Sequence, residues 1–353
     1  KPLVGYFSYE FGYQFEPSRW QSLPIAAGQI MFRFFEATCW YKVDHSRKSA
    51  KIVIASGVDT GLANRFISFI HKHVPRTYKL VSHSRTGTPP AKQCSELSTA
   101  QYTHAVRQIL EDIHAGRYYE LNFTQRFHTQ SPVPPAHLFS DLFTSLNPRY
   151  GWFGRFANES ILSISPELFL HKRGSRVQTC PIKGSFTSQP TRAEQEKLSA
   201  EHIMVVDLAR NDLGRISDKA WVSVAEMSGI RQFGALSHLE SRIVGETSLS
   251  LQEILAATYP AASITGTPKV ETVQAIAQYE SSSRGVYTGS AGVIWPDGDF
   301  QLNVAIRTLS AKPADLQQWQ YTLGAGGAII AGSDPEQEHK ECLEKVKPLL
   351  AKL

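Results

Sequence analysis

Lys183 is the first residue in this sequence whose type and setting could do chemistry. It follows Pro181 and Ile182 at the end of an expected strand and precedes the turn residue Gly184. An amine among apolar neighbours has its pKa lowered, and a neutral amine is a nucleophile or a base at neutral pH. We therefore expect an uncharged Lys183. A lysine whose stem packs on the protein while its ammonium reaches water would show the same pattern.

Glu201 is a carboxylate on the apolar stripe of an expected long helix, residues 191–212. It shares that stripe with Met204, Val205 and Leu208 at helical spacing, so an unpaired carboxylate would point at the edge of the core. A metal ion or another cation would explain it, and so would a glutamate at the rim with its head group in water.

Three charged residues of the expected last helix, Glu338, Glu341 and Lys345, project from one side because they are spaced by three and four residues. A solvated face is the usual meaning of such spacing. Just before this helix, the glycine-rich stretch "YTLGAGGAIIAGSD" lets a ligand approach the backbone near Gly326. It lacks the spacing of a phosphate-binding loop.

Arg307 and Glu167 lie on the polar sides of two expected strands. In the strand 300–309 the apolar residues alternate with a face that carries Arg307, and a guanidinium fork suits a carboxylate. In "ILSISPELFL", Glu167 lies on the side of the serines. Exposed sheet faces would look the same in both cases. Together these groups predict an anion-binding enzyme, with Mg²⁺ as a candidate cofactor.

Composition narrows the class of protein. The chain has 353 residues, of which 42% are hydrophobic and 20% charged, enough for a large core. The net charge of +5 comes from scattered basic residues, which favours a small anionic ligand over nucleic acid. Four cysteines without a CxxC pair indicate neither a disulfide framework nor a zinc site.

No apolar run is long enough to span a bilayer, and the chain does not open with a signal pattern. We therefore expect a cytoplasmic protein without a membrane partner.

Strands and helices mix irregularly along the chain, which predicts one large α+β unit. Residues 1–81 are expected to be mainly strand with one helix at 61–74, in an N-terminal part that we expect to be truncated, and residues 82–98 to be an exposed loop. Further helices are expected at 99–116, 191–212, 251–259 and 268–280, and from Asp334-Pro335 onward. Asp297-Gly298 predicts a hairpin turn.

Ten segments in succession resemble the chorismate-utilising enzymes, the family of anthranilate synthase component I, aminodeoxychorismate synthase component I and the isochorismate and salicylate synthases. They are "GYFSYEFGYQFE", "AGRYYELNFTQRF", "SISPELFL", "PIKGS", "EHIMVVDLARNDLGR", "SHLESRIVG", "SITGTPK", "GVYTGSAGVIW", "NVAIRTL" and "GAGGAIIAGSDPEQEHKE". The resemblance implies a single α/β domain over residues 1–353, with two packed, mainly antiparallel sheets, outer helices and a catalytic core at 99–353.

The lysine of "PIKGS" resembles the aminodeoxychorismate synthase branch, because anthranilate and isochorismate synthases carry alanine there. The implied reaction converts chorismate and ammonia to 4-amino-4-deoxychorismate, for para-aminobenzoate and folate biosynthesis, with ammonia from a glutamine amidotransferase partner. Anthranilate synthase component I is one alternative. A catalytically inactive chorismate-binding regulatory subunit is another.

The resemblance also implies residue roles. Lys183 would add to C2 of chorismate while Glu167, as general acid, protonates the departing C4 hydroxyl. Glu201 and Glu341 would hold Mg²⁺, with Glu338 acting through a metal-bound water. The remaining implied contacts are the enolpyruvyl carboxylate with Tyr287 and Arg307, the ring carboxylate with Lys345 and Gly326, and the ring pocket with Thr265 and His238.

Three positions depart from the family pattern. Glu120 stands where ammonia users usually have glutamine and water-adding members a catalytic lysine, which argues against isochorismate synthesis and leaves its own charge unexplained. Cys180 replaces a frequent arginine, and Ser185 a threonine. The role of His238, which assists pyruvate loss in anthranilate synthases, stays open at this point, as does tryptophan binding.

Overall fold

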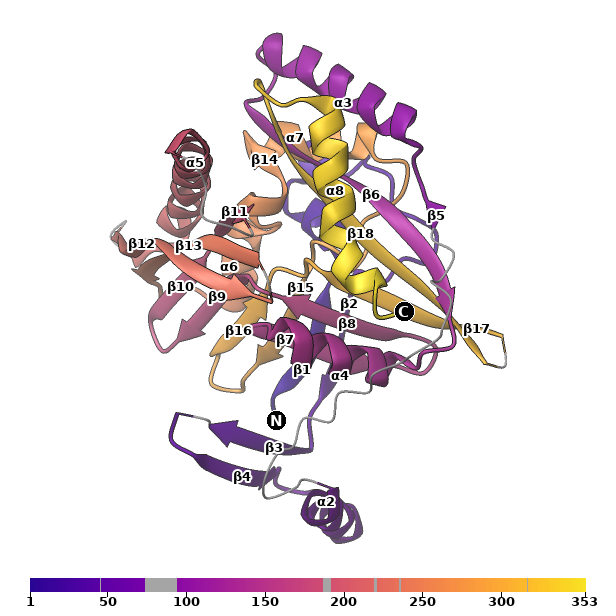
Figure 1. Ribbon diagram of the computed structural model, residues 1–353. Helices are drawn as coiled ribbons and strands as arrows, with labels where there is room; N and C mark the ends of the chain where they lie inside the picture. The colour runs from indigo at the N-terminus through magenta and orange to yellow at the C-terminus, as the bar shows by residue number, and fades with distance from the viewer. Residues whose placement is uncertain (45, 74–93, 187–191, 219–220, 235, 316) are drawn as a thin grey trace.

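Two large antiparallel sheets form the body of the protein (Figure 1). The computed structural model describes residues 1–353 except 45, 74–93, 187–191, 219–220, 235 and 316. Within these residues, the nine strands of the larger sheet are β1 (Leu3–Phe7), β2 (Phe32–Glu36), β9 (Leu168–Arg173), β10 (Arg176–Cys180), β11 (Ile182–Phe186), β12 (Val222–Phe233), β13 (Leu236–Glu246), β15 (Ser290–Ile294) and β16 (Phe300–Asn303).

The smaller sheet has seven strands in the described part of the chain: β5 (Cys94–Ser95), β6 (Glu120–Ser131), β7 (Tyr150–Arg155), β8 (Ser160–Ser165), β14 (Gly266–Thr267), β17 (Thr308–Asp315) and β18 (Gln318–Ile330). The strand orders are β11-β13-β10-β9-β16-β15-β1-β2, with β12 on β13, and β14-β6-β18-β17-β8-β7, with β5 on β6. This arrangement confirms the expected α+β fold of two sheets.

Helices pack around the two sheets. They are α1 (Pro17–Trp20), α2 (Thr60–His73), α3 (Thr99–His114), α4 (Pro135–Leu146), α5 (Arg192–Ile216), α6 (Leu251–Thr258), α7 (Lys269–Tyr279) and α8 (Pro335–Leu350), with 3₁₀ turns η1 (Tyr9–Phe15) and η3 (Ala262–Ile264). Figure 1 shows α8 lying along β18, and α5 beside β11 and β13. These two helices carry the candidate metal-binding glutamates.

The expected helix starts are confirmed at two positions. Ser98 caps α3 through a capping box with Gln101, in which each side chain satisfies a backbone N–H of the other residue. Asp334 caps α8 by accepting from the backbone N–H of Gln337, and Pro335 occupies the first turn. The cap fixes the start of α8 and therefore which of its side chains, Glu338, Glu341 and Lys345 among them, lie on one side of the helix.

The structure tests the predictions for the N-terminal part, residues 1–81, better than those for the expected loop, residues 82–98. Strands β1, β2, β3 (Cys39–Asp44) and β4 (Ser49–Ile54) confirm strands in this segment, and α2 confirms the helix expected at 61–74, but the expectation of a single helix is wrong because η1 and α1 also lie there. The hairpin β3–β4 and α2 extend from the body in Figure 1. Most of the expected loop 82–98 lies outside the described residues; its last residues form β5 and the cap of α3. The boundary of a catalytic core at residue 99 stays a prediction.

Two expected single strands are wrong, because each crosses from one sheet to the other. The segment 160–172 ends β8 at Ser165 and begins β9 at Leu168 in the larger sheet. The segment 300–309 leaves the larger sheet after Asn303 and joins the smaller sheet at Thr308. A period-two pattern continues through such a crossing, so the sequence does not reveal it. Glu167 and Arg307 lie in the two crossings.

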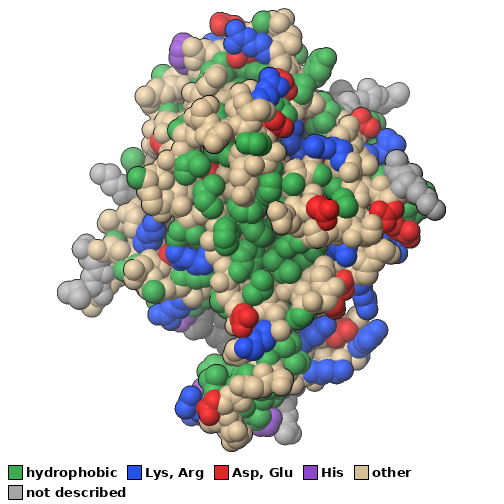
Figure 2. All heavy atoms as spheres, turned by 180° about the vertical axis from the view of Figure 1, so that it is seen from behind, with side chains coloured by type: hydrophobic (Ala, Val, Ile, Leu, Met, Phe, Trp, Pro, Cys, Tyr) green, Lys and Arg blue, Asp and Glu red, His purple; other side chains and the backbone are tan. Residues whose placement is uncertain are grey.

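The hydrophobic core lies between the sheets and under the helices. Phe123 and Phe127 of β6, Leu162 of β8 and Leu302 of β16 are among its fully buried members. At the edge of the larger sheet, β2 exposes the side chains of Phe32 and Phe35. Figure 2 shows hydrophobic side chains gathered in the middle of the rear face. None of the described helices is both long and apolar enough to cross a membrane.

Candidate active site

Lys183 sits at a bulge in β11. The pairing of β11 with β13 shifts register between Lys183 and Ser185, where Gly184 has a φ of 69°. A Cβ on Gly184 would meet a Cδ atom of Leu198 at 2.7 Å, so both the backbone conformation and the packing favour glycine. The bulge re-aims the chain next to Lys183.

The amine of Lys183 forms an ion pair that joins the two sheets. Its Nζ donates to Oε1 of Glu120, the first residue of β6, at 2.8 Å, and the two side chains are 13% and 1% exposed. The second carboxylate oxygen of Glu120, Oε2, is buried and has no hydrogen-bond partner among the described residues. The residue that departed from the family pattern is therefore the partner of the candidate nucleophile.

The expected lowered pKa of Lys183 is wrong in this structure. Burial does lower it, but the carboxylates of Glu120, Glu201 and Glu341 raise it by more, so that the pKa of Lys183 lies above its ordinary value. The sequence pattern showed the apolar neighbours on either side of the lysine, not the carboxylates brought in from β6, α5 and α8. Lys183 is thus an ammonium in the resting protein.

Glu167 lies between the sheets in the crossing from β8 to β9. It is 3% exposed, and Ser263 Oγ donates to its Oε1 at 2.6 Å. Burial raises the pKa of Glu167 to about 7, even though the Ser263 hydrogen bond and the Lys183 charge oppose the shift. A carboxyl group with this pKa is half protonated near neutrality, as a general acid requires.

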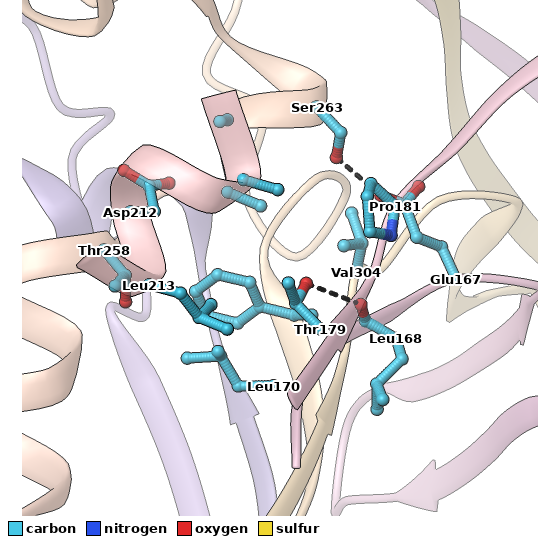
Figure 3. A pocket seen from close by; sticks show the side chains of 14 residues that line it. Glu167, Leu168, Leu170, Thr179, Pro181, Asp212, Leu213, Thr258, Ser263 and Val304 are labelled. Carbon is cyan, nitrogen blue, oxygen red and sulfur yellow. Dashed lines mark hydrogen bonds between the residues drawn. The ribbon is translucent and has the colours of Figure 1, made fainter. Parts of the chain in front are cut away.

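A small cavity of about 20 Å³ borders Glu167, Ser263 and Asp212 (Figure 3), which is room for one water molecule. Figure 3 shows Glu167 and Asp212 on opposite sides of it. Ser263 was not among the residues singled out from the sequence. It is the first residue of the family segment "SITGTPK" and follows an apolar stretch, "YPAA".

Arg307 lies in the second crossing, from β16 to β17, with a φ of 50°. Two backbone hydrogen bonds, both of 3.1 Å, connect the two crossings. The N–H of Val304 donates to Glu167 O, and the N–H of Ile164 donates to Arg307 O. Burial lowers the pKa of Arg307 to about 10, and Glu167 opposes that shift. Glu167 and Arg307 are therefore brought to one place by backbone contacts.

His238 of β13 contacts this group directly. Its Nε2 is 3.0 Å from Arg307 Nη2, and its Nδ1 is 3.1 Å from the carbonyl oxygen of Gly184. The side chain is 3% exposed, which together with the positive charge of Arg307 lowers its pKa to about 4. The candidate residues on β11, β13 and the Arg307 crossing thus form one connected cluster.

The glutamates and the lysine of α8 face the glycine-rich strand β18. Lys345 Nζ donates to Gly326 O at 2.9 Å and to Glu341 at 2.7 Å. Glu338 accepts from Ser333 Oγ at 2.7 Å, and its other oxygen comes within 3.4 Å of where a Cβ on Gly327 would lie. The expected charged side of α8 therefore covers β18, although Glu341 itself is 52% exposed.

The carboxylates near Lys183 fit a divalent cation by their chemistry. Within the described residues, no group of three or more His, Cys, Asp or Glu is assembled as a metal cage. Mg²⁺ usually takes one or two carboxylates and completes its shell with water and substrate oxygens. Glu201 and Glu341 both raise the pKa of Lys183, so two carboxylates from different helices act on the same buried point.

Thr265 and Tyr287 are positioned by other contacts. The Thr265 hydroxyl donates back to Ala261 O and Ala262 O in its own turn. The Tyr287 ring packs over β18, where a Cβ on Gly324 would meet it at 2.2 Å, and Arg126 lies over the ring at 5.1 Å. Neither residue is hydrogen bonded to Lys183, Glu167 or Arg307 in the described structure, so their expected roles stay predictions.

These features define a two-sheet α+β protein that buries a carboxyl group, an amine and an arginine at the junction of its sheets. Residues 1–351 match the chorismate binding enzyme family, and the chain belongs to that family. It is a chorismate-utilising enzyme.

Named relatives fall in more than one branch. The chain is 31% identical to aminodeoxychorismate synthase component 1 of Escherichia coli over 99% of its length and 76% of the relative's. It is 35% identical to an anthranilate synthase component 1 of Haloarcula marismortui over 73% of this chain and 53% of that protein. The fold matches anthranilate synthase component I of Streptococcus pneumoniae with a TM-score of 0.83 and 24% identity, covering 99% of this chain and 80% of that one.

Proposed function

We propose that this enzyme aminates chorismate, converting chorismate and ammonia to 4-amino-4-deoxychorismate. The observation that carries the proposal is the buried Nζ of Lys183, 2.8 Å from a carboxylate and close enough to Glu167 to influence its pKa. A base, a nucleophile and an acid in one site are what the displacement of a poor leaving group requires. The relative from Escherichia coli bears the name of this activity.

Forming the nucleophile is the first step. The ammonium of Lys183 has no lone pair, so Nζ must lose a proton before it can attack. Glu120 Oε1 is in hydrogen-bond contact with Nζ, and it accepts that proton within the pair. Because Glu120 is buried, the exchange of an ion pair for two neutral groups is less costly here than in water.

Displacement of the hydroxyl follows. The neutral Nζ forms a bond to C2 of chorismate, the two ring double bonds shift, and the C4–O bond breaks. The protonated carboxyl of Glu167 gives its proton to the departing oxygen, which leaves as water. The product of this half-reaction is a lysine adduct that carries one positive charge on nitrogen, beside an ionised Glu167.

Ammonia then replaces the lysine. Its nitrogen bonds to C4, the double bonds return, and the C2–N bond breaks so that Lys183 leaves as a neutral amine. The new C4 ammonium gives a proton to the Glu167 carboxylate, and Glu120 returns its proton to Lys183. Glu167 is again a carboxylic acid, the Lys183–Glu120 ion pair is restored, and the enolpyruvyl group stays on the product.

The other side chains hold the substrate. Arg307 would bind the enolpyruvyl carboxylate together with Tyr287, and Lys345 beside Gly326 would bind the ring carboxylate. Mg²⁺ held by Glu201 and Glu341, with Glu338 through water, would draw electron density toward that ring carboxylate. Thr265 would line the ring pocket.

A separate glutamine amidotransferase would supply the ammonia. The name "component 1" of the Escherichia coli relative indicates an enzyme of more than one component, and ammonium salts can replace such a partner in an assay. The product would enter para-aminobenzoate and folate biosynthesis, and we place the reaction in the cytoplasm.

Mass spectrometry of the products tests the proposal. The purified chain is incubated with chorismate, Mg²⁺ and ammonium chloride, and 4-amino-4-deoxychorismate is expected without release of pyruvate. Anthranilate with an equal amount of pyruvate would instead identify an anthranilate synthase. Binding of chorismate without turnover, under any nitrogen source, would identify an inactive binding subunit.

A further inference from the structure

The contacts of His238 fix the positions of its ring protons. Nδ1 lies 3.1 Å from Gly184 O, and a carbonyl oxygen can only accept, so Nδ1 carries the hydrogen. Nε2 lies 3.0 Å from Arg307 Nη2, and a guanidinium can only donate, so Nε2 is bare and accepts. The ring is therefore a neutral imidazole with its proton on Nδ1, placed between two fixed partners.

The electrostatic surroundings keep His238 in this form. Burial lowers its pKa most, and the positive charges of Arg307 and Lys345 lower it further, to about 4, against the opposing effect of the Gly184 carbonyl. Protonation would place an N–H against the N–H of Arg307. His238 thus has no proton to give from Nε2 near neutral pH.

Arg307 is held but not neutralised by its protein contacts. Its guanidinium lies 3.9 Å over the Phe233 ring, Nη2 donates to His238, and Nη1 is buried without a partner in the described residues. Arg284, the contrasting buried arginine, donates to both oxygens of Glu280 and to backbone carbonyls. Its pKa is raised, whereas that of Arg307 is lowered. An anion from outside the protein would accept a hydrogen bond from Arg307 Nη1 and balance its charge.

We propose that His238 is a positioning residue for Arg307, and not an acid or base. Its ring connects the guanidinium, through Nε2, to the Gly184 carbonyl, through Nδ1. Gly184 directly follows Lys183, so this bridge sets the spacing between the group that holds a substrate carboxylate and the amine that attacks the ring. The inference rests on the proposed function for the identity of the attacking group.

Two substitutions separate the two contacts of the ring. Asparagine at 238 can donate to Gly184 O as Nδ1 does but is too short to accept from Arg307, whereas the longer glutamine can offer Oε1 to Arg307. The measurement is chorismate affinity by calorimetry with Mg²⁺ and without ammonium. We expect His238→Asn to weaken binding roughly 10- to 100-fold, the value of a hydrogen bond to a charged group. His238→Gln should restore most of that affinity.

Steady-state kinetics with ammonium provide the second measurement. A positioning role predicts that His238→Asn raises KM more than it lowers kcat, and that the pH profile keeps its shape in both variants. Equal losses of kcat in both variants, with unchanged chorismate affinity, would show an acid–base role and overturn the inference. So would unchanged affinity and unchanged kinetics in both.

Nitrogen NMR tests the same point on the ring of the unsubstituted protein, and a variant is needed only to assign the signal. With ¹⁵N-labelled histidine, and with the His238→Gln spectrum for assignment, His238 should show a protonated Nδ1, a bare Nε2 and no titration between pH 5 and 8. A proton on Nε2, or titration in that range, would overturn the inference. Affinity and NMR do not depend on the product, so anthranilate formation would reject the proposed function alone.

Discussion

Lys183–Glu120 and Lys269–Asp212 are two buried lysine–carboxylate pairs with the same N–O distance, 2.8 Å. The exposed fractions of the two lysine side chains are also close, 13% and 15%. Both lysines belong to segments that resemble family motifs, "PIKGS" and "SITGTPK". By distance and burial alone, neither pair would be singled out over the other.

Their surroundings differ. Lys269 also donates to Thr258 O at 2.7 Å, so its ammonium bonds to residues from α5 and α6 while it opens α7. Burial lowers the pKa of Lys269 and raises that of Asp212. One cation therefore meets one anion and one carbonyl, and the pair ties three helices together.

The Lys183 pair instead has an excess of negative charge. Three carboxylates raise the pKa of one ammonium, and Glu120 Oε2 is left without a hydrogen bond. An unsatisfied buried oxygen costs about 1–3 kcal/mol, which a purely structural pair has no reason to carry. Incomplete bonding, rather than burial or distance, therefore distinguishes the Lys183–Glu120 pair from the Lys269–Asp212 pair, and it is the Lys183–Glu120 pair that we propose to be reactive.

The largest expected effect comes from replacing each lysine by arginine, which keeps the charge but cannot become a nucleophile. Lys183→Arg should lower the rate of chorismate amination by roughly 10⁴-fold or more, because covalent catalysis is lost. Lys269→Arg keeps a cation beside Asp212 and should retain a rate near that of the unsubstituted enzyme. The measurement is product formation per folded enzyme.

Chorismate affinity is the control for this pair of variants. Both should still bind chorismate, since neither change removes Arg307 or Lys345. An active Lys183→Arg enzyme would contradict the covalent route. If both variants lost the reaction equally, the functional distinction between the two pairs would be wrong.

The next effect is on stability and concerns Lys269–Asp212, the closed pair, whose charges are matched by each other. Lys269→Met leaves Asp212 buried without its cation, which should cost about 3–5 kcal/mol in the free energy of unfolding. Adding Asp212→Leu replaces the pair by apolar groups and should recover most of that loss. Urea unfolding followed by circular dichroism measures both. A double variant no more stable than Lys269→Met would show that the charge of Asp212 is not the cause.

The sequence predicted α2, α3, α5, α6, α7 and α8 because these helices depend on local features, but it missed α1 and α4. The capping residues of α3 and α8 mark their starts within a few positions, and the Asp297-Gly298 turn correctly joins β15 and β16. Periodicity also placed Glu338, Glu341 and Lys345 on one side of α8. Each of these depends on neighbours along the chain.

The electrostatics of the site could not be predicted in this way. Glu120 is 63 residues from Lys183 in the chain, and a pattern of apolar neighbours gives no information about a carboxylate on another sheet. The two crossings between sheets were missed for a related reason: alternation continues through them. Glu167 consequently has a buried site and a pKa of about 7, where the strand pattern indicated a half-exposed side chain.

Glu120→Gln tests the base of the reactive pair. Among the described residues, Glu120 is the acceptor to which Nζ is hydrogen bonded, and its carboxylate is lost in this variant while Glu201 and Glu341 still raise the pKa of Lys183. Amination at pH 7 should therefore fall about 10²-fold, the usual contribution of a general base. The rate should rise with pH up to the Glu167 pKa of about 7, because Lys183 must now lose its proton to water, and should level off above it, where Glu167 loses its own proton. The measurement is the pH dependence of the rate.

Asp212→Asn is the matched change in the closed pair. It should alter stability and leave the shape of the pH profile unchanged, since Asp212 bonds to Lys269 and not to the nucleophile. A Glu120→Gln profile identical to that of the unsubstituted enzyme, with no loss of rate, would mean that another group accepts the proton.

The smallest expected effect is a shift in pH dependence from Ser263→Ala. In the proposed mechanism Glu167 acts in its protonated form, and its pKa is about 7, so the rate should fall as the pH rises above neutrality. The Ser263 hydroxyl donates to Glu167 Oε1 and favours the ionised form. Without it the pKa of Glu167 rises, and the alkaline limb should move up by about one pH unit, the equivalent of one hydrogen bond.

The direction of that shift separates two roles for Ser263. If the serine only shapes the cavity beside Glu167, its loss would admit water, lower the cost of burying a carboxylate and move the limb to lower pH. Ser263→Thr, which keeps a hydroxyl, should restore the original limb if the hydrogen bond is the cause. An upward shift in alanine that threonine reverses would therefore assign the tuning of the acid to this one contact.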